Sequence, residues 1–179
     1  EVVIAPDGRV VVYLGDDERG EFLYKFVSSA SYVPGGDTST LLDEGTLFVA
    51  KFNEDGSGEW MALTPETTGM SAPEIAIRTR LAASKVGATT MDRPEWVAAN
   101  PIAAEAYCAL TNNKNRGVKP NAGGDATPVG GPNPRETNNY GQVVRWRPEG
   151  GDHAADGGVV AEVGRFEGEA LAVVGERPF

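Results

Sequence analysis

The segment TTMDRPEW, residues 89–96, concentrates chemically useful side chains in a short stretch. Arg93 carries five N–H donors in a planar fork, a geometry suited to binding a phosphate through two parallel hydrogen bonds. Glu95 stands between a proline and a tryptophan, which indicates a carboxylate held in a defined direction. The simpler alternative is that Arg93 only pairs with Asp92 or Glu95, and that Glu95 is a surface carboxylate.

Further oxygen-bearing side chains follow two of the expected strands. Asp16 and Asp17 come after the run VVVYL, and Asn112 and Asn113 come after YCAL. Carboxylate and amide oxygens that converge suit a hard cation, above all Ca²⁺, which takes six to eight oxygen ligands. A cation cluster beside an arginine can stabilise the charge that develops in phosphoryl transfer. The alternative is a solvated turn with no ligand.

Short apolar runs rich in β-branched and aromatic residues predict the strands that would position these groups. The first part of the chain predicts strands near Val2–Ala5, Arg9–Leu14 and Glu21–Val27, and a hairpin in 45–63. The hairpin turn NEDGSG looks like a calcium loop but lacks the downstream glutamate, so we interpret it as an ordinary turn. One helix is expected over 71–88, capped by Ser71, with Ile75, Leu81 and Val86 on one face.

After the helix the strand pattern begins again, with Pro101 in the place of Pro6 and a repeat of about 95 residues. A weak fourth strand is expected at Val159–Gly164. Tandem four-stranded antiparallel units are typical of the blades of a β-propeller. The expected fold is therefore a mainly β propeller fragment of about two four-stranded blades, with one short helix and long loops. The alternative is a compact two-sheet β-sandwich.

The expected organisation has four parts: 1–70, a first blade with a long insertion; 71–88, the inserted helix; 89–164, a second blade with a polar loop at 113–140; and 165–179, the start of a third blade or a tail. Two blades cannot close a propeller and would leave sheet edges open. The chain is expected to need the remainder of a parent propeller, or another copy of itself. The polar loop could carry Lys114 and Arg116 over the site, or act as a flexible spacer.

Composition narrows the possible partners. The 179 residues have a formal net charge of −10, which argues against nucleic acid because its phosphates would be repelled. No apolar run approaches the length of a membrane span. The single cysteine, Cys108, excludes an intrachain disulfide and is expected to be a buried thiol within a strand. His153 has no partner pattern around it and is assigned no role.

Five blocks of the sequence resemble the PhoX family of bacterial alkaline phosphatases: GDDERGEFLYKFVS, LLDEGTLFVAKFN, IRTRLAASKVGATTMDRPEW, YCALTNN and NPRETNNYGQVVRW. They occur in the family's order from about Asp16 to Trp146. The resemblance implies a six-bladed propeller that hydrolyses phosphate monoesters through a cluster of Ca²⁺ and Fe³⁺. It also implies export in the folded state by the twin-arginine route, and so a periplasmic or secreted protein.

The resemblance assigns roles to matching residues. Arg93 would be the catalytic and phosphate-contacting residue and Glu95 a metal ligand, since both lie in the DRPEW block. Asp16 and Asp17, in the GDDE block, would be calcium ligands. Asn112 as a substrate contact and Asn113 as a metal ligand are added from the expected geometry.

The chain also departs from the family pattern. The block with the family's iron-binding cysteine and its neighbouring glutamate is absent, and Cys108 does not replace it. GRFEGEALAVV resembles a block expected before residue 1, which would make Glu169 a ligand; an ordinary propeller repeat is the alternative. The sequence thus predicts part of a metal-dependent phosphatase that is inactive alone. The alternative function is a noncatalytic or lactonase-like calcium-binding propeller module.

Overall fold

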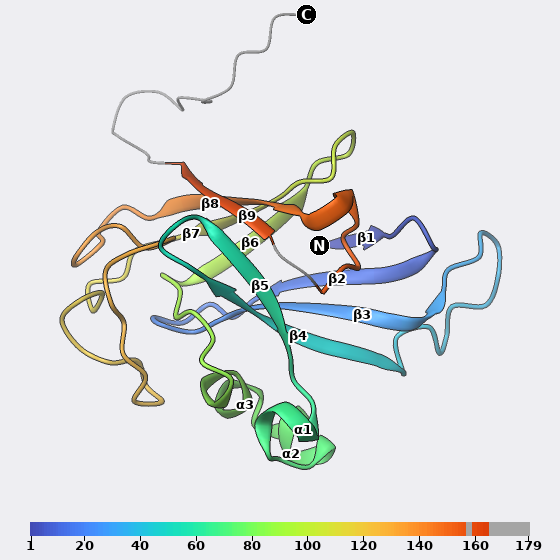
Figure 1. The fold of residues 1–179 in the computed structure, drawn as a ribbon, viewed down its shortest axis with the longest axis horizontal. Coiled ribbons are helices and arrows are strands. Elements are labelled where there is room, and N and C mark those ends of the chain that lie inside the picture. Colours follow the sequence, from blue (N-terminus) through green and yellow to red (C-terminus); the bar gives the residue numbers. More distant parts are fainter. Residues whose placement is uncertain (157–158, 165–179) are drawn as a thin grey trace, which may run out of the picture.

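The structure is a computed structural model that describes residues 1–156 and 159–164 (Figure 1). The first unit has five antiparallel strands: β1 (Val2–Ile4), β2 (Arg9–Gly15), β3 (Leu23–Ser31), β4 (Gly45–Phe52) and β5 (Ser57–Ala62). The second unit has four: β6 (Pro94–Ala99), β7 (Ala106–Leu110), β8 (Gln142–Pro148) and β9 (Val159–Gly164). The strand order is β1-β2-β3-β4-β5-β9-β8-β7-β6, so among the described residues β1 and β6 form the two edges.

The mainly β, propeller-like fragment expected from the sequence is confirmed, with one difference in strand number. The predicted hairpin around Asp55 forms β4 and β5, so the first unit has the five strands predicted individually, one more than the four of the expected blade. The Asp55 carboxylate accepts hydrogen bonds from the backbone N–H and the hydroxyl of Ser57, which confirms an ordinary hairpin turn. The expected start of a third blade at 165–179, with Glu169, lies outside the described residues.

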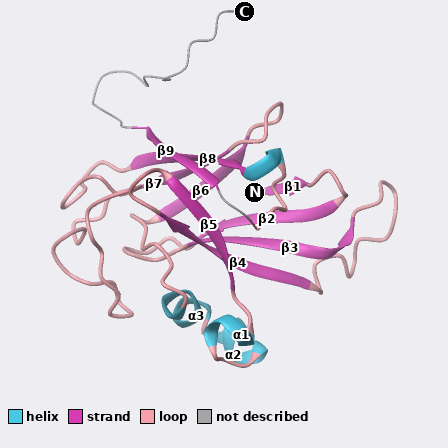
Figure 2. Cartoon of the chain, in the orientation of Figure 1, coloured by secondary structure: helices cyan, strands magenta, loops and turns pink. Residues whose placement is uncertain are grey.

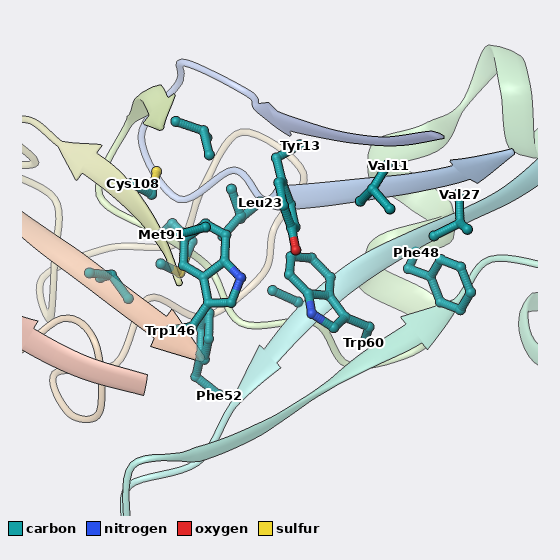
Figure 3. Close-up of a cluster of buried hydrophobic side chains, with 14 of the residues drawn as sticks. Val11, Tyr13, Leu23, Val27, Phe48, Phe52, Trp60, Met91, Cys108 and Trp146 are labelled. Carbon is teal, nitrogen blue, oxygen red and sulfur yellow. The ribbon is translucent and has the colours of Figure 1, made fainter. Parts of the chain in front are cut away.

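The two units pack against each other through one large core, and among the described residues a short β5–β9 ladder and an isolated bridge between Arg19 and Asp92 join them. Figure 3 shows the centre of this core, where the rings of Tyr13, Trp60 and Trp146 lie close together. The ring centroids of Tyr13 and Trp146 are 5.2 Å apart, and those of Trp60 and Trp146 are 6.1 Å apart. Aromatic rings supply much of the apolar area buried in such a core, and edge-to-face pairs add further stabilisation. Cys108 is buried in the same core, as expected.

The helical segment differs from the single helix predicted over 71–88. It consists of α1 (Pro65–Thr68), α2 (Ala72–Ile77) and α3 (Thr79–Lys85), and Figure 2 shows them together at one side of the first unit. The chain breaks at Arg78, whose φ of −122° and ψ of 47° are not helical. The break changes the direction of α3 relative to α2. As a result α3 buries Ala82 and Ala83, whereas Leu81 is 45% exposed. The predicted apolar face was therefore wrong at Leu81, although Ile75 is buried as expected.

The connection between β7 and β8 is held by buried hydrogen bonds around Arg116, whereas Lys114 is exposed and its expected role in steering substrate stays a prediction. The Arg116 guanidinium is buried and donates to Asp92 Oδ1 at 2.7 Å, and also to the carbonyl of Thr90 at 2.8 Å. Asn113 and Asn138, at the two ends of this connection, donate to the same buried carboxylate. The expectation that Arg116 could steer substrate is thus wrong, because its charge is neutralised inside the protein.

A second buried cation holds the segment after β8 on the core. The Lys25 ammonium is buried, donates to the carbonyls of His153 and Ala155, and lies 4.9 Å from the centroid of Trp60. Burial lowers the pKa of Lys25 to about 7. His153 pairs through Nδ1 with the Tyr13 hydroxyl at 2.9 Å, so its role is structural packing and hydrogen bonding. Across the described ranges, no helix is long and apolar enough to cross a membrane.

Candidate functional site

The candidate site forms where the corner after β2 meets the start of β6. Backbone hydrogen bonds join the two segments: Gly20 N–H donates to the Met91 carbonyl at 2.9 Å, and Met91 N–H donates to the Glu21 carbonyl at 2.8 Å. A Cβ on Gly15 would lie 2.3 Å from the Pro94 carbonyl oxygen. Only glycine allows so close an approach, which brings the Asp16–Asp17 corner of the first unit beside Arg93 of the second.

Arg93 has an unusual backbone conformation and two carboxylate partners. Its φ is 51°, in the left-handed region that a non-glycine residue enters at a cost of about 1–3 kcal/mol. Its guanidinium contacts Asp17 through Nε at 3.0 Å and Nη2 at 3.2 Å, and contacts Glu95 through Nη2 at 3.0 Å. Because Asp17 and Arg93 come from different units, this cluster exists only when the two units pack together.

The other side chains predicted for the site lie in different surroundings. Thr111, at the end of β7, donates through its hydroxyl to Glu95 Oε1 at 2.8 Å and so orients that carboxylate. Asn112 is exposed beside it. Asn113 is buried, with its amide donating to Asp92 and its Oδ1 accepting from the N–H of Asn115. The ligand role of Asn113 stays a prediction, since both ends of its side chain are already engaged.

Asp16 pairs with Arg80 rather than with Arg93. Its two carboxylate oxygens accept from Nη2 and Nε of Arg80, at 2.6 and 2.7 Å, in a bidentate pair that ties the corner to α3. The expected convergence therefore holds for Asp17, Arg93 and Glu95, whereas Asp16 and Asn113 have other partners. The metal-ligand role of Asp16 stays a prediction.

Glu21 is a buried carboxyl behind the same corner. Its side chain is 2% exposed, and Oε2 lies 3.4 Å from Nε of Arg80. Burial raises the pKa of Glu21 to about 7, in opposition to the Arg80 charge, because a carboxylate loses its hydration when it leaves water. The nearby carboxylates of Asp16 and Asp125 raise it further.

Replacing Glu21 by glutamine should change how stability depends on pH. The native carboxyl keeps its proton up to pH about 7, whereas the unfolded chain releases it near 4.5. The native state then binds more protons than the unfolded state between these values, so stability falls as pH rises through this window. We expect Glu21→Gln to remove a decline of roughly 1–3 kcal/mol, measured by urea unfolding across the window. Exposed Glu59→Gln is the control, and a pH-independent difference would contradict the shift.

The donor chemistry of the cluster fits a hard cation only in part. Asp17 and Glu95 supply carboxylate oxygens of the kind that Ca²⁺ prefers. In the part of the chain that the structure describes, however, no group of three or more His, Cys, Asp or Glu side chains could hold a metal ion. Cys108 is buried in the core, and burial raises the pKa of its thiol to about 12, which disfavours the thiolate that iron binds. The described residues thus fit part of a calcium site and do not fit an iron site.

Two contributors to this region, Thr111 and Arg80, were missed in the sequence, and Asp92 was expected only as a partner of Arg93. Thr111, Arg80 and Asp92 act on Glu95, Asp16 and Arg116 respectively. Thr111 stands directly before the asparagines in LTNN, so its place beside the site could have been inferred. For Arg80 and Asp92 no local signal exists, since their partners lie 64 and 24 residues away along the chain.

Comparisons with known proteins agree with this architecture. The family model of the alkaline phosphatase PhoX matches residues 1–161. Among solved structures, the chain is similar to Pseudomonas fluorescens PhoX in complex with vanadate, a transition state analogue, with 44% sequence identity and a TM-score of 0.81. This similarity covers 90% of the chain but 30% of the Pseudomonas chain, so the protein spans less than a third of that relative. The search of curated proteins gave no match. The match over most of its length shows that the chain belongs to the PhoX family of alkaline phosphatases.

Proposed function

We propose that the chain supplies part of the active site of a metal-dependent phosphatase that hydrolyses phosphate monoesters. The observation that carries the proposal is Arg93, held at a φ of 51° between carboxylates of two different units. Strained backbone of this kind occurs mostly where function requires a side chain to point in a fixed direction. Vanadate, which the similar Pseudomonas structure holds as a transition state analogue, supports phosphoryl chemistry.

Within this proposal Arg93 binds the phosphate of the substrate, because its planar fork matches two phosphate oxygens. Asp17 and Glu95 are metal ligands, and Thr111 keeps the Glu95 carboxylate oriented. Exposed Asn112 lies next in the chain and is a second substrate contact. The two carboxylates carry one negative charge more than the Arg93 guanidinium neutralises, so the binding of phosphate by Arg93 requires a further cation beside them.

Calcium is the proposed metal, and it would neutralise charge on the phosphate oxygens during transfer. Iron remains a proposal from the family resemblance, with ligands outside the described residues. We further propose that the remaining ligands come from the rest of a parent propeller or from another copy of the chain. A periplasmic or secreted location is proposed on the same resemblance.

The binding of inorganic phosphate in the presence of Ca²⁺ tests the role of Arg93. We expect Arg93→Lys to weaken phosphate binding by about tenfold or more, because a lysine cannot make the bidentate contact. The matched control is Arg9→Lys, at the opposite end of β2, where Arg9 pairs with exposed Asp7. Calorimetric titration measures both, and equal affinities for Arg93→Lys and the parent protein would contradict the assignment.

Elemental analysis combined with the hydrolysis of p-nitrophenyl phosphate tests whether the site is complete. We expect Ca²⁺ at most and no turnover, because the described residues offer too few ligands. Bound iron with calcium-stimulated turnover would show that the chain holds a full active site. Ca²⁺ binding without phosphate binding would favour the noncatalytic propeller module.

A further inference from the structure

A cavity of about 570 Å³ opens beside the corner after β2, and Arg93 is not part of its lining. Its wall comes from three segments: the corner with Asp16 and Glu21, the α2–α3 region, and the turn 121–125 of the β7–β8 connection. None of these segments is adjacent to the others in the sequence. The cavity therefore belongs to the folded chain and has no counterpart in any single motif.

Glu21 lines this cavity, and one of its carboxyl oxygens lacks a hydrogen-bond donor. Its side chain is 2% exposed, and Oε2 has no hydrogen-bond partner. The nearest cation, Nε of Arg80, lies 3.4 Å away but directs its N–H to Asp16 at 2.7 Å. A buried carboxyl oxygen without a donor is costly, so a donor supplied by a ligand would be stabilising.

The remaining wall carries charges of both signs. Arg78 and Arg80 line it, and the Arg80 charge is paired with Asp16. Asp125 adds a carboxylate without an arginine partner among the described residues, and it accepts from the Ser84 hydroxyl at 2.7 Å and the Asn121 amide at 3.1 Å.

The side chains of Ile77 and Leu81, which are 82% and 45% exposed, line the mouth. The lining includes no aromatic ring, which disfavours a sugar, and no group of three metal ligands occurs among the described residues.

We propose that this cavity binds an alkylammonium group, whose ammonium hydrogen-bonds to Glu21 and Asp125 and whose alkyl stem lies against Ile77 and Leu81. An ammonium has three donors, enough to satisfy both carboxylates at once. The cavity volume leaves room for several methylene groups behind the charge. This proposal is independent of the proposed phosphatase function, because Arg93, Asp17 and Glu95 are not among the residues that line the cavity.

The charge state of Glu21 gives the binding a pH dependence. Burial raises its pKa to about 7, Arg80 opposes the shift, and Asp16, Asp125 and Glu18 add to it. Only the ionised carboxylate attracts an ammonium strongly, so the affinity should rise as pH increases from below 7 to above it.

Calorimetric titration with spermidine tests the proposal, with 1,4-butanediol as the uncharged comparison. We expect the protein to bind spermidine and not the diol, and Glu21→Gln to weaken binding about tenfold or more through loss of the charged acceptor. Glu59→Gln is the matched control, since Glu59 is exposed on β5 and pairs with Lys51 outside the cavity. Circular dichroism verifies that each variant is folded.

Asp125→Asn gives a second, independent change in another segment of the cavity wall, and we expect it to weaken spermidine binding as well. The proposal is overturned if the parent protein does not bind spermidine, or if Glu21→Gln and Glu59→Gln bind it equally. Binding of Ca²⁺ that Glu21→Gln abolishes, without any binding of spermidine, would also overturn it in favour of a metal site. These outcomes are independent of phosphate binding at Arg93.

Discussion

Replacing Asp92 by asparagine should lower the free energy of unfolding by about 3–5 kcal/mol, because Arg116 would remain buried without its counter-ion. Asp92 is fully buried and accepts hydrogen bonds from Arg116, Asn113 and Asn138. The asparagine amide keeps the size of the side chain but removes its charge. The cost of an unpaired buried cation far exceeds the loss of one neutral hydrogen bond.

Urea unfolding followed by tryptophan fluorescence measures this effect. The control is Lys51→Gln, which breaks the half-exposed pair between Lys51 and Glu59 and should cost less than about 1 kcal/mol. A double variant, Asp92→Asn with Arg116→Met, removes both charges and should regain part of the lost stability. If Asp92→Asn costs no more than Lys51→Gln, the pair does not hold the β7–β8 connection in place.

Replacing Gly15 by alanine should both destabilise the protein and separate Asp17 from Arg93. The added Cβ would lie 2.3 Å from the Pro94 carbonyl oxygen, closer than any nonbonded contact allows. The end of β2 must then move away from the start of β6, at an expected cost of about 1–3 kcal/mol or more. The same movement pulls the Asp16–Asp17 corner away from the strained arginine.

Two measurements follow the effect of Gly15→Ala: urea unfolding for stability, and phosphate binding in the presence of Ca²⁺ for the site. Gly123→Ala is the matched control, because a Cβ there would meet only ordinary contacts at 3.4 and 3.5 Å. We expect both measurements to change for Gly15→Ala and neither for Gly123→Ala. Unchanged stability of Gly15→Ala would show that the two units tolerate a wider separation.

The two variants affect the same segment in different ways: Gly15→Ala acts on the docking of the first unit against β6, whereas Asp92→Asn acts on contacts within the second unit. The Asp92 network holds the β7–β8 connection against the segment that precedes β6, and Gly15 permits the close approach of β2. Arg93 directly follows Asp92 in the chain and directly precedes Pro94, whose carbonyl lies close to Gly15. The contact between Asp17 and Arg93 therefore forms only while the two units remain packed together.

The sequence alone predicted the strands well, because each strand carries its own pattern of burial. In β8 the residues Gln142, Val144 and Trp146 are buried and alternate with less buried neighbours. The hairpin at Asp55 and the cap at Ser71, whose N–H and hydroxyl donate to Glu74, are also local signals. Alternation, turns and caps depend on residues close in the chain, so they can be read without the fold.

The break at Arg78 could not be predicted in the same way. The pattern over 71–88 fits one helix, and the segment lacks an internal proline or glycine between Ile75 and Lys85 that would end it. Packing of Ala82 and Ala83 against the first unit accompanies the break and exposes Leu81. Tertiary contacts of this kind override a local preference of a few tenths of a kcal/mol per residue.

The types of residue in the site were evident from the sequence, since DRPEW and GDDE carry the arginine and carboxylates that phosphate and cation chemistry need. The tertiary structure decided which of them meet. Arg93 pairs with Asp17, 76 residues earlier, and Asp16 turns to Arg80 on α3. Neighbouring side chains at a tight corner point in different directions, so adjacent aspartates reach different partners. Only the packing of the two units determines which one faces Arg93.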